Sequence, residues 1–353
     1  MTVYCYYFNV VLTMFAGYCK INMNDNIKEV FPMAKSRFTK ITAAASAVLV
    51  LCSCGKENGF AENSSFFFDT YSHTTICGSN SEETMKALTQ IYTSLDTSFS
   101  LCYNTAAVQL PDDKAYDECL SSVRALTDKY DTGINVACGE LTSLWGISTD
   151  TPRVPAESEI LEALTQIPDN NSFTETTMLD FGAVAKGYAC DKAYELLTTT
   201  ETEYATVSLG SSTLLYGEKP NSKFRAGVTN PDTVKGYLGV IETDAAFIST
   251  SGGYERYFEA DGKRYSHILD METGYPAETD LTSVTVVIPA ETEDGGIMSD
   301  FLSTLIYIQG TSQLDKWLAC EEFELVAADV NGVVYTDCEG FTLDENSGYT
   351  YGK

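Results

Sequence analysis

Hydrophobic and polar positions follow a helical period through the first half of the chain. Apolar residues recur every three or four positions from Ser81, with Met85, Leu88 and Ile91 among them. This spacing is typical of a helix with one buried face. The same period predicts further helices over residues 119–130, 139–145, 160–167 and 184–198. We therefore expect the first half to be mostly helical.

Beyond residue 200 the pattern changes to short runs rich in β-branched and aromatic residues, separated by Gly, Pro, Asn and Asp. The predicted strands are residues 66–76, ahead of the helices, and then 204–209, 213–216, 224–228, 237–241, 247–250, 264–269, 282–288, 325–330 and 333–336. Asn331-Gly332 lies between the last two predicted strands, and an Asn-Gly pair in this position indicates a β-hairpin. One more helix is predicted over residues 298–308. We expect a single α+β domain over residues 66–350, with short mixed or antiparallel strands in its second half.

The amino-terminal region has the pattern of a secretion signal. Lys35, Arg37 and Lys40 precede an uncharged run over residues 41–51, which is too short to span a bilayer comfortably. The run ends in Leu51-Cys52-Ser53-Cys54-Gly55, which resembles a bacterial lipobox. We expect a signal peptide over residues 33–54, lipidation of Cys54 and a polar tether over residues 55–65. Residues 1–32 are then an upstream extension, with Met33 as the initiator.

The charge and the cysteine content argue against several classes of protein. The 353 residues include 50 acidic and 22 basic side chains, and 48 acidic and 17 basic ones follow Cys54. Nucleic-acid binding requires clustered Lys and Arg, so a nucleic-acid partner is not expected. Seven cysteines follow Cys54 with no CxxC spacing. Neither a zinc site nor a disulfide framework is indicated.

The decapeptide over residues 179–188 is the first candidate for chemistry. It reads as a turn containing Gly182 and Gly187 that leads into a helix, with Lys186 beside it. Free N–H groups at a helix start bind phosphate well, and glycine lets a ligand approach the backbone. A plain connection between elements has the same appearance. No Walker sequence or Gly-x-Ser-x-Gly elbow is present.

Two other segments carry suitable side chains. Asp300 and Thr304 are four residues apart in a predicted helix, so they share one face and could hold Mg²⁺ through oxygen. A helix-capping carboxylate beside an ordinary threonine explains the same spacing. His267, one of two histidines, is suited to proton transfer near neutral pH, although a histidine in a strand is often structural.

Taken together and in order, several stretches resemble the ApbE-type flavin transferases. They are Asp180-Phe181-Gly182-Ala183-Val184-Ala185-Lys186-Gly187, Ser249-Thr250-Ser251-Gly252, Tyr265-Ser266-His267-Ile268-Leu269-Asp270 and Ser299-Asp300-Phe301-Leu302-Ser303-Thr304. Proteins of this kind are bacterial lipoproteins that use FAD and Mg²⁺ to attach FMN to a Thr or Ser of an acceptor protein, releasing AMP. The resemblance covers about residues 66–345.

The resemblance also implies roles for individual residues. FAD contacts fall on Phe68, Gly133, Ile134, Asn135, Asp180, Lys186 and Ile268. Metal ligands fall on the Ala183 carbonyl, Asp300, Ser303 and Thr304, and His267 is the base. Two positions depart from the usual pattern. Asn135 stands where Asp is usual, and Ser211-Ser212 stand where Gly-Gly is usual.

We therefore expect an FAD:protein FMN transferase, lipid-anchored in a bacterial cell envelope on the periplasmic face of the inner membrane if the cell is Gram-negative. Its acceptor would be a membrane-associated redox protein. Two alternatives remain open on the sequence. Water in place of the acceptor hydroxyl gives an FAD pyrophosphatase that produces FMN and AMP. The second alternative is a lipoprotein that binds flavin but catalyses no reaction.

Overall fold

The structure is a computed structural model that describes residues 59–102, 114–130, 134–168, 173, 177–233 and 236–352. Its centre is a nine-stranded sheet in the order β1-β2-β3-β4-β7-β10-β11-β12-β14. The strands are β1 Phe60–Phe67, β2 Thr70–Gly78, β3 Thr202–Leu209, β4 Ser212–Gly217, β7 Ala246–Gly252, β10 Leu281–Pro289, β11 Glu324–Asp329, β12 Val333–Thr336 and β14 Thr350–Tyr351. Neighbouring strands are antiparallel except β12 and β14.

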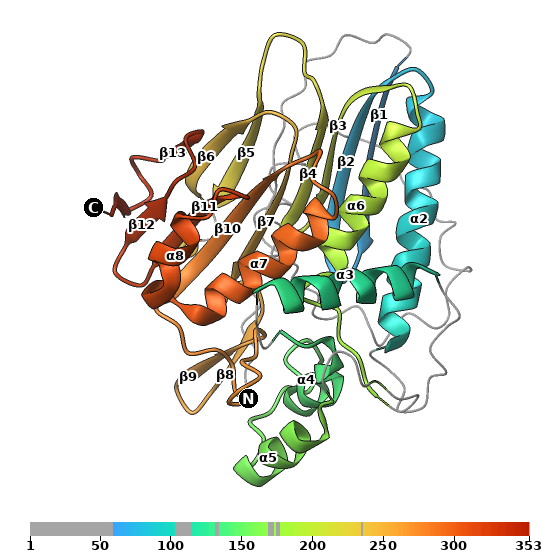
Figure 1. Cartoon of the computed structure of the whole chain (residues 1–353). Helices are drawn as coiled ribbons and strands as arrows, with labels where there is room; N and C mark the ends of the chain where they lie inside the picture. The colour runs from blue at the N-terminus through green and yellow to red at the C-terminus, as the bar shows by residue number, and fades with distance from the viewer. Residues whose placement is uncertain are drawn as a thin grey trace, which may run out of the picture.

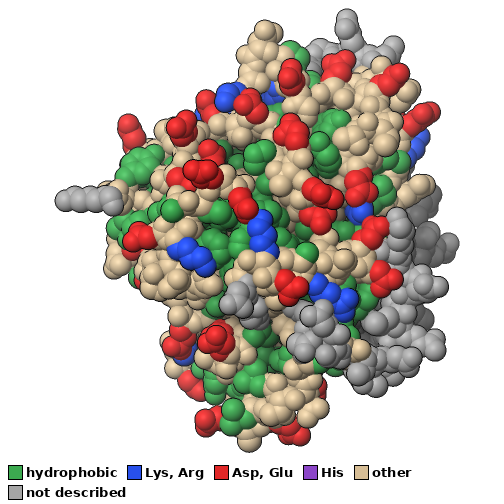
Figure 2. All heavy atoms as spheres, in the orientation of Figure 1, with side chains coloured by type: hydrophobic (Ala, Val, Ile, Leu, Met, Phe, Trp, Pro, Cys, Tyr) green, Lys and Arg blue, Asp and Glu red, His purple; other side chains and the backbone are tan. Residues whose placement is uncertain are grey.

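Helices cover one face of this sheet (Figure 1). They are α2 Ser81–Cys102, α3 Lys114–Tyr130, α6 Ala185–Thr198 and α7 Gly295–Gln309. A three-stranded sheet of β5 Phe224–Thr229, β6 Tyr237–Thr243 and β13 Phe341–Leu343 packs on the other face. Acidic side chains greatly outnumber basic ones on the helix-bearing surface (Figure 2).

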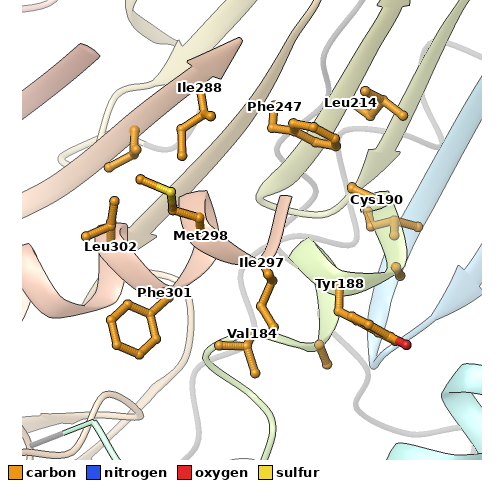
Figure 3. Close-up of a cluster of buried hydrophobic side chains, with 14 of the residues drawn as sticks. Val184, Tyr188, Cys190, Leu214, Phe247, Ile288, Ile297, Met298, Phe301 and Leu302 are labelled. Carbon is orange, nitrogen blue, oxygen red and sulfur yellow. The ribbon is translucent and has the colours of Figure 1, made fainter. Parts of the chain in front are cut away.

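The two-residue period of the strands divides the core between these faces. In β7, Phe247 packs with the helices, whereas Ile248 packs with the three-stranded sheet. In β10, Ile288 and Val287 are divided in the same way, because successive strand side chains point to opposite faces. Figure 3 shows the helix side of this core, where α6 and α7 meet the sheet.

A smaller unit lies at one end of the sheet (Figure 1). It consists of α4 Gly139–Trp145, α5 Glu157–Gln166 and the hairpin of β8 Tyr257–Ala260 and β9 Lys263–Ser266. Trp145 is fully buried in its own apolar cluster, and its indole N–H donates to the Gly274 carbonyl at 2.8 Å. The remaining helical turns are η1 Val136–Cys138, η2 Thr311–Gln313 and α8 Leu314–Leu318.

The predicted α+β architecture is confirmed. The five helices predicted before residue 200 correspond to α2, α3, α4, α5 and α6. The Asn331-Gly332 hairpin is present, with β11 antiparallel to β12. None of the helices in the described ranges has the length and apolar content to cross a bilayer.

The prediction of one strand over residues 66–76 was wrong. A hairpin occupies this region, and its first strand begins at Phe60, inside the segment expected to be a tether. The chain reverses at Phe68 and Asp69, whose φ angles are 51° and 54°. Aspartate tolerates this left-handed conformation through local hydrogen bonding, whereas phenylalanine rarely adopts it, so the apolar run hides the turn.

The prediction of a strand over residues 264–269 was also wrong at its end. β9 stops at Ser266, so His267 and Ile268 lie in the connection that follows. The partner strand β8 was missed altogether. Asp261 and Gly262 both have positive φ and form its tight turn, and an Asp-Gly pair is a hairpin signal that the sequence did contain.

Candidate functional site

Helices α6 and α7 cross with their backbones in contact. A Cβ atom on Gly187 would collide with the Gly296 carbonyl, and one on Gly296 would collide with the Gly187 carbonyl. Glycine is therefore required at both positions for the helices to approach this closely. The prediction that α7 begins at residue 298 was wrong, since Gly295 and Gly296 form its first turn.

Asp191 of α6 caps the start of α7. Its two carboxylate oxygens accept the N–H groups of Gly296 and Ile297, both at 2.7 Å. These are donors that a helix start leaves unpaired, and a negative charge there is favoured by the helix dipole. Burial raises the pKa of Asp191 to about 7, against the lowering effect of the two N–H groups.

Asp300 of α7 points back at α6. The Gly187 N–H donates to its Oδ2 at 3.0 Å, and the Ser212 hydroxyl donates to its Oδ1 at 3.1 Å. The ammonium of Lys186 lies 3.5 Å from Oδ2, and Asp300 is only 2% exposed. The carboxylate is thus buried and held in one orientation by two hydrogen bonds and a nearby cation.

The phosphate-binding helix start that the sequence suggests over residues 179–188 is only partly present. The Gly187 N–H is already bonded to Asp300, and the glycine admits α7 rather than a ligand. The Lys186 ammonium remains available at the mouth of the turn, 3.5 Å from the Gly182 carbonyl. Among the described residues no backbone N–H bonds to the Ala183 carbonyl, so this oxygen can serve another partner.

The hydroxyl groups expected beside Asp300 form a cluster with β7. Ser251 Oγ lies 2.8 Å from Ser303 Oγ and 3.0 Å from Thr304 Oγ1. Ser303 and Thr304 also donate to the Asp300 carbonyl, at 2.9 and 3.2 Å. Ser251 is not among the predicted ligands, although it lies in the Ser249-Thr250-Ser251-Gly252 stretch that carries the resemblance.

His267 is held by the backbone of Arg256. Its N–H and its Nδ1 lie 3.1 and 3.2 Å from the Arg256 carbonyl oxygen. A carbonyl can only accept, so Nδ1 carries the proton and Nε2 is the free acceptor. Burial lowers the pKa of His267 to about 3, and the charges of Arg256 and Lys186 act in the same direction. Ile268 beside it is buried.

The amino-terminal hairpin reaches this region through Arg256. The Arg256 guanidinium donates to the Asp69 carbonyl at 3.0 Å. Phe68, the predicted flavin contact, is partly buried, and its N–H donates to Asp96 Oδ1 at 2.8 Å. The structure therefore joins the hairpin turn to the His267 segment.

Asn135 and Asp180 lie on adjacent segments. The Asp180 N–H donates to the Val136 carbonyl at 2.8 Å, and the Asp180 carboxylate accepts the Gly182 N–H at 2.7 Å. The Asn135 side chain accepts from the Ala137 N–H at 2.9 Å and donates to the Pro168 carbonyl at 2.7 Å. Aspartate could not make the second bond, which explains why an amide suits this chain. Ile134 is buried.

The second departure also has a structural role. Ser212 is a partner of Asp300, and the Ser211 carbonyl accepts the Thr250 N–H of β7 at 3.0 Å. Sequence reasoning missed Ser212, Glu255 and Arg256, because no local pattern shows that a strand turn and a later loop meet at α7. Gly133 and Cys54 lie outside the described residues.

The donor set around Asp300 fits Mg²⁺. It offers one buried carboxylate and the hydroxyls of Ser303 and Thr304. The Ala183 carbonyl, in the turn before α6, accepts no backbone N–H of the described residues and is a further oxygen ligand that the resemblance implies. Within the described ranges no three His, Cys, Asp or Glu side chains gather as a metal cluster. Mg²⁺ is commonly bound by one or two carboxylates together with substrate phosphates, whereas a zinc or multi-carboxylate site needs more such ligands.

Known structures share this fold. The ApbE protein of Thermotoga maritima superimposes with a TM-score of 0.67 and 25% identity, over 78% of this chain and 96% of that one. The apo flavinyl transferase ApbE of Pseudomonas stutzeri gives 0.64 at 22% identity, over 78% and 94%. The fold is thus that of the ApbE proteins. A model of the ApbE family matches residues 68–327, and the chain belongs to this family.

Curated relatives are named FAD:protein FMN transferase. One from Klebsiella pneumoniae is 34% identical over 210 residues, which cover 56% of this chain and 64% of the relative. One from Treponema pallidum is 32% identical over 225 residues, covering 56% and 60%. The chain spans less than two thirds of the length of these relatives.

Proposed function

We propose that this protein is an FAD:protein FMN transferase that moves FMN from FAD to a Thr or Ser hydroxyl of an acceptor protein and releases AMP. The names of its relatives and its family membership support an activity of this kind. One observation carries the proposal furthest. The buried Asp300 carboxylate is fixed by the Gly187 N–H of α6, the Ser212 hydroxyl of β4 and the ammonium of Lys186.

The residues present suit phosphoryl transfer from a pyrophosphate. Asp300, Thr304, Ser303 and the Ala183 carbonyl would hold Mg²⁺, and Lys186 would bind phosphate oxygens. When bound, Mg²⁺ would neutralise pyrophosphate charge within a very acidic protein. FAD would lie with its flavin side toward Phe68, Ile134, Asn135, Asp180 and Ile268, the positions implied by the resemblance.

His267 would act as the base. Its free Nε2 takes the proton of the acceptor hydroxyl, the hydroxyl oxygen bonds to the phosphorus on the FMN side, and the bond from that phosphorus to AMP breaks. AMP leaves with the electron pair. The pKa of His267 keeps it unprotonated and ready at neutral pH, and the phosphate charges of bound FAD would raise that pKa toward a value suited to a base.

The test is to incubate the purified domain with FAD, MgCl₂ and a flavin-acceptor domain. We expect a covalently fluorescent acceptor, a mass increase of one FMN on a Thr or Ser, and one AMP per label. FMN and AMP without labelled acceptor would replace the proposal by an FAD pyrophosphatase. Recovery of unchanged FAD would instead indicate a flavin-binding protein that catalyses no reaction.

We also propose that the protein is lipid-anchored at Cys54 in the cell envelope, close to a membrane-associated redox protein as acceptor. The support is the basic, apolar and lipobox-like sequence of residues 33–54. Replacing Cys54 by Ser should move the expressed protein from the membrane fraction to the soluble fraction. An unchanged distribution would contradict the anchor.

A further inference from the structure

Glu255 is a partly buried residue that the mechanism above does not use. It lies in the connection between β7 and β8, with its N–H bonded to the Gly252 carbonyl at 3.4 Å. Its Oε1 atom is buried, and no residue of the described ranges donates to it. This carboxylate oxygen is therefore left bare, without a hydrogen bond from the described residues.

Charged groups from three elements act on this carboxylate. Lys186 of α6 and Arg256 of the same connection attract it, whereas Asp300 of α7 repels it. Burial opposes the charge most strongly and raises the pKa of Glu255 to about 7. The geometry also connects Glu255 to the proposed site. The preceding strand β7 contacts Ser303 and Thr304 through Ser251, and the carbonyl of the next residue, Arg256, holds His267.

A bare carboxylate oxygen in such a place is costly to the folded protein. A buried polar atom without a hydrogen bond loses the stabilisation that water would give it, and a charged one loses more. An apolar side chain of similar size would avoid this cost. The arrangement makes sense if a ligand supplies the missing donor.

The charges around Glu255 favour a neutral donor over a cation. Lys186 and Arg256 already place two positive charges near the carboxylate, so a further cation would be repelled. A hydroxyl group supplies one donor without added charge. In a dinucleotide such as FAD, hydroxyls of the ribityl chain and of the ribose flank the pyrophosphate on its two sides.

We infer that Glu255 is a substrate-binding residue whose Oε1 accepts a hydrogen bond from a sugar hydroxyl of FAD. This inference rests on the proposed function, because it takes FAD as the ligand of the site. The ribityl chain and the ribose of FAD both carry hydroxyl groups. Separate binding measurements with FMN, which contains the ribityl chain, and AMP, which contains the ribose, show which of the two Glu255 contacts.

The experiment compares Glu255→Met, which has similar length and no carboxylate, with Glu255→Gln, which keeps one acceptor oxygen. Glu259→Gln, on the exposed side of β8, is the matched control. Dissociation constants for FAD, FMN and AMP are measured by calorimetry on the whole purified domain, first in buffer containing EDTA and then with MgCl₂ in place of EDTA. Thermal unfolding of each variant is recorded in parallel.

We expect Glu255→Met to weaken FAD binding by about tenfold or more, as for loss of a hydrogen bond to a charged group. Glu255→Gln should weaken it less, and Glu259→Gln should leave it unchanged. Weaker binding of FMN alone would assign the ribityl chain, and weaker binding of AMP alone would assign the ribose. Glu255→Met should be at least as stable as the unaltered protein, because a buried bare carboxylate has been removed.

Two results would overturn the inference. One is that both variants bind FAD, FMN and AMP as tightly as the unaltered protein. The other is that binding weakens only when Mg²⁺ is added, which would make Glu255 a cation ligand. Since the readout is binding, it is separate from the flavin-transfer assay. Failure of that assay together with weakened FAD binding would reject the transferase proposal and keep this one.

Discussion

The two sides of the site are built in different ways. The helix side consists of α6 and α7, joined through Gly187, Asp191, Gly296 and Asp300. Here the carboxylates of Asp191 and Asp300 accept four hydrogen bonds of 2.7–3.1 Å from the protein itself. The loop side consists of residues 253–256 and 267–268. Here Glu255 keeps a bare oxygen, and among the described residues the His267 ring has one hydrogen-bond partner, the Arg256 carbonyl.

The difference shows where the protein is preorganised and where it depends on its ligand. On the helix side, packing fixes the position of the residues expected to hold the metal before anything binds. On the loop side, the described residues leave Glu255 Oε1 without a donor, and the His267 ring bonds through Nδ1 to the Arg256 carbonyl. Four experiments test this difference between the two sides.

The largest effect is expected from Asp300→Asn on the helix side. The amide keeps the shape but loses the charge that would hold Mg²⁺, so we expect flavin transfer to fall by roughly 10³-fold, as when a principal charge-stabilising group is removed. Initial rates over a range of MgCl₂ concentrations measure this. Asp315→Asn, on the exposed side of α8, is the control. Full activity of Asp300→Asn would reject the metal assignment.

Gly187→Ala should damage the fold of the helix side itself. The added methyl group meets the Gly296 carbonyl and the Asp300 side chain, so α6 and α7 must separate. We expect a loss of about 1–3 kcal/mol in the free energy of unfolding, typical of overpacking. Urea denaturation measures it. Gly236→Ala is the control, because its Cβ meets only Thr233 Oγ1 at 3.6 Å. Equal stability of the two variants would contradict the close crossing.

Asp191→Asn should have a smaller effect of the same kind. The amide has one acceptor oxygen where the carboxylate has two, so one N–H at the start of α7 loses its partner. We expect a loss of about 1–2 kcal/mol, the cost of a buried unsatisfied donor. Hydrogen exchange of the Gly296 and Ile297 amides should quicken in the variant. Unaltered exchange would show that the cap does not hold the helix start.

The last prediction, on the loop side, is a pH dependence from His267, which stays small near neutral pH. Its pKa in the folded protein is about 3, below the ordinary 6.5, so only the unfolded chain takes up this proton between those values. This residue therefore makes the protein less stable as the pH falls from about 7 toward 3. Asp191 and Glu255, whose pKa values are raised, act in the opposite sense. The difference in unfolding free energy between the protein and His267→Gln isolates the His267 contribution.

In the same titration, NMR of the ring should show no protonation of His267 between pH 8 and pH 5. Signals absent from the His267→Gln spectrum identify it. A midpoint near 6.5 would show that burial and the two cations do not act on this ring.

The sequence predicted what depends on local pattern. The helical period located α2 to α6, and Asn331-Gly332 located the turn between β11 and β12. What it missed depends on contacts between distant segments. The sequence suggests a turn at Gly296, whereas the structure places it in the contact between α7 and α6. The sequence suggests a strand at Phe68, whereas this residue forms the turn between β1 and β2.

The candidate site shows the same division between features that follow from local pattern and features that depend on contacts between distant segments. Local patterns single out Asp300, Thr304, Lys186 and His267, but each pattern also has an ordinary structural explanation. The resemblance over several stretches then implies their roles. The roles of Ser212 and Glu255 could not be predicted, since they depend on a strand turn and a loop meeting at α7. Asn135 was identified as a departure, but its bond to Pro168 required the structure.

The early start of β1 limits how far the domain could lie from a membrane. Under the proposed lipidation of Cys54, six residue steps separate the lipid from Phe60, so the lipid would lie at most about 20 Å from the strand. β1 then runs for eight residues, about 24 Å between its end residues, to the turn that Arg256 joins to the His267 segment. An upright strand of this length would place the proposed site beyond an acceptor hydroxyl held at the lipid surface. The proposed anchor therefore requires an acceptor that rises from the membrane or a domain that lies along it.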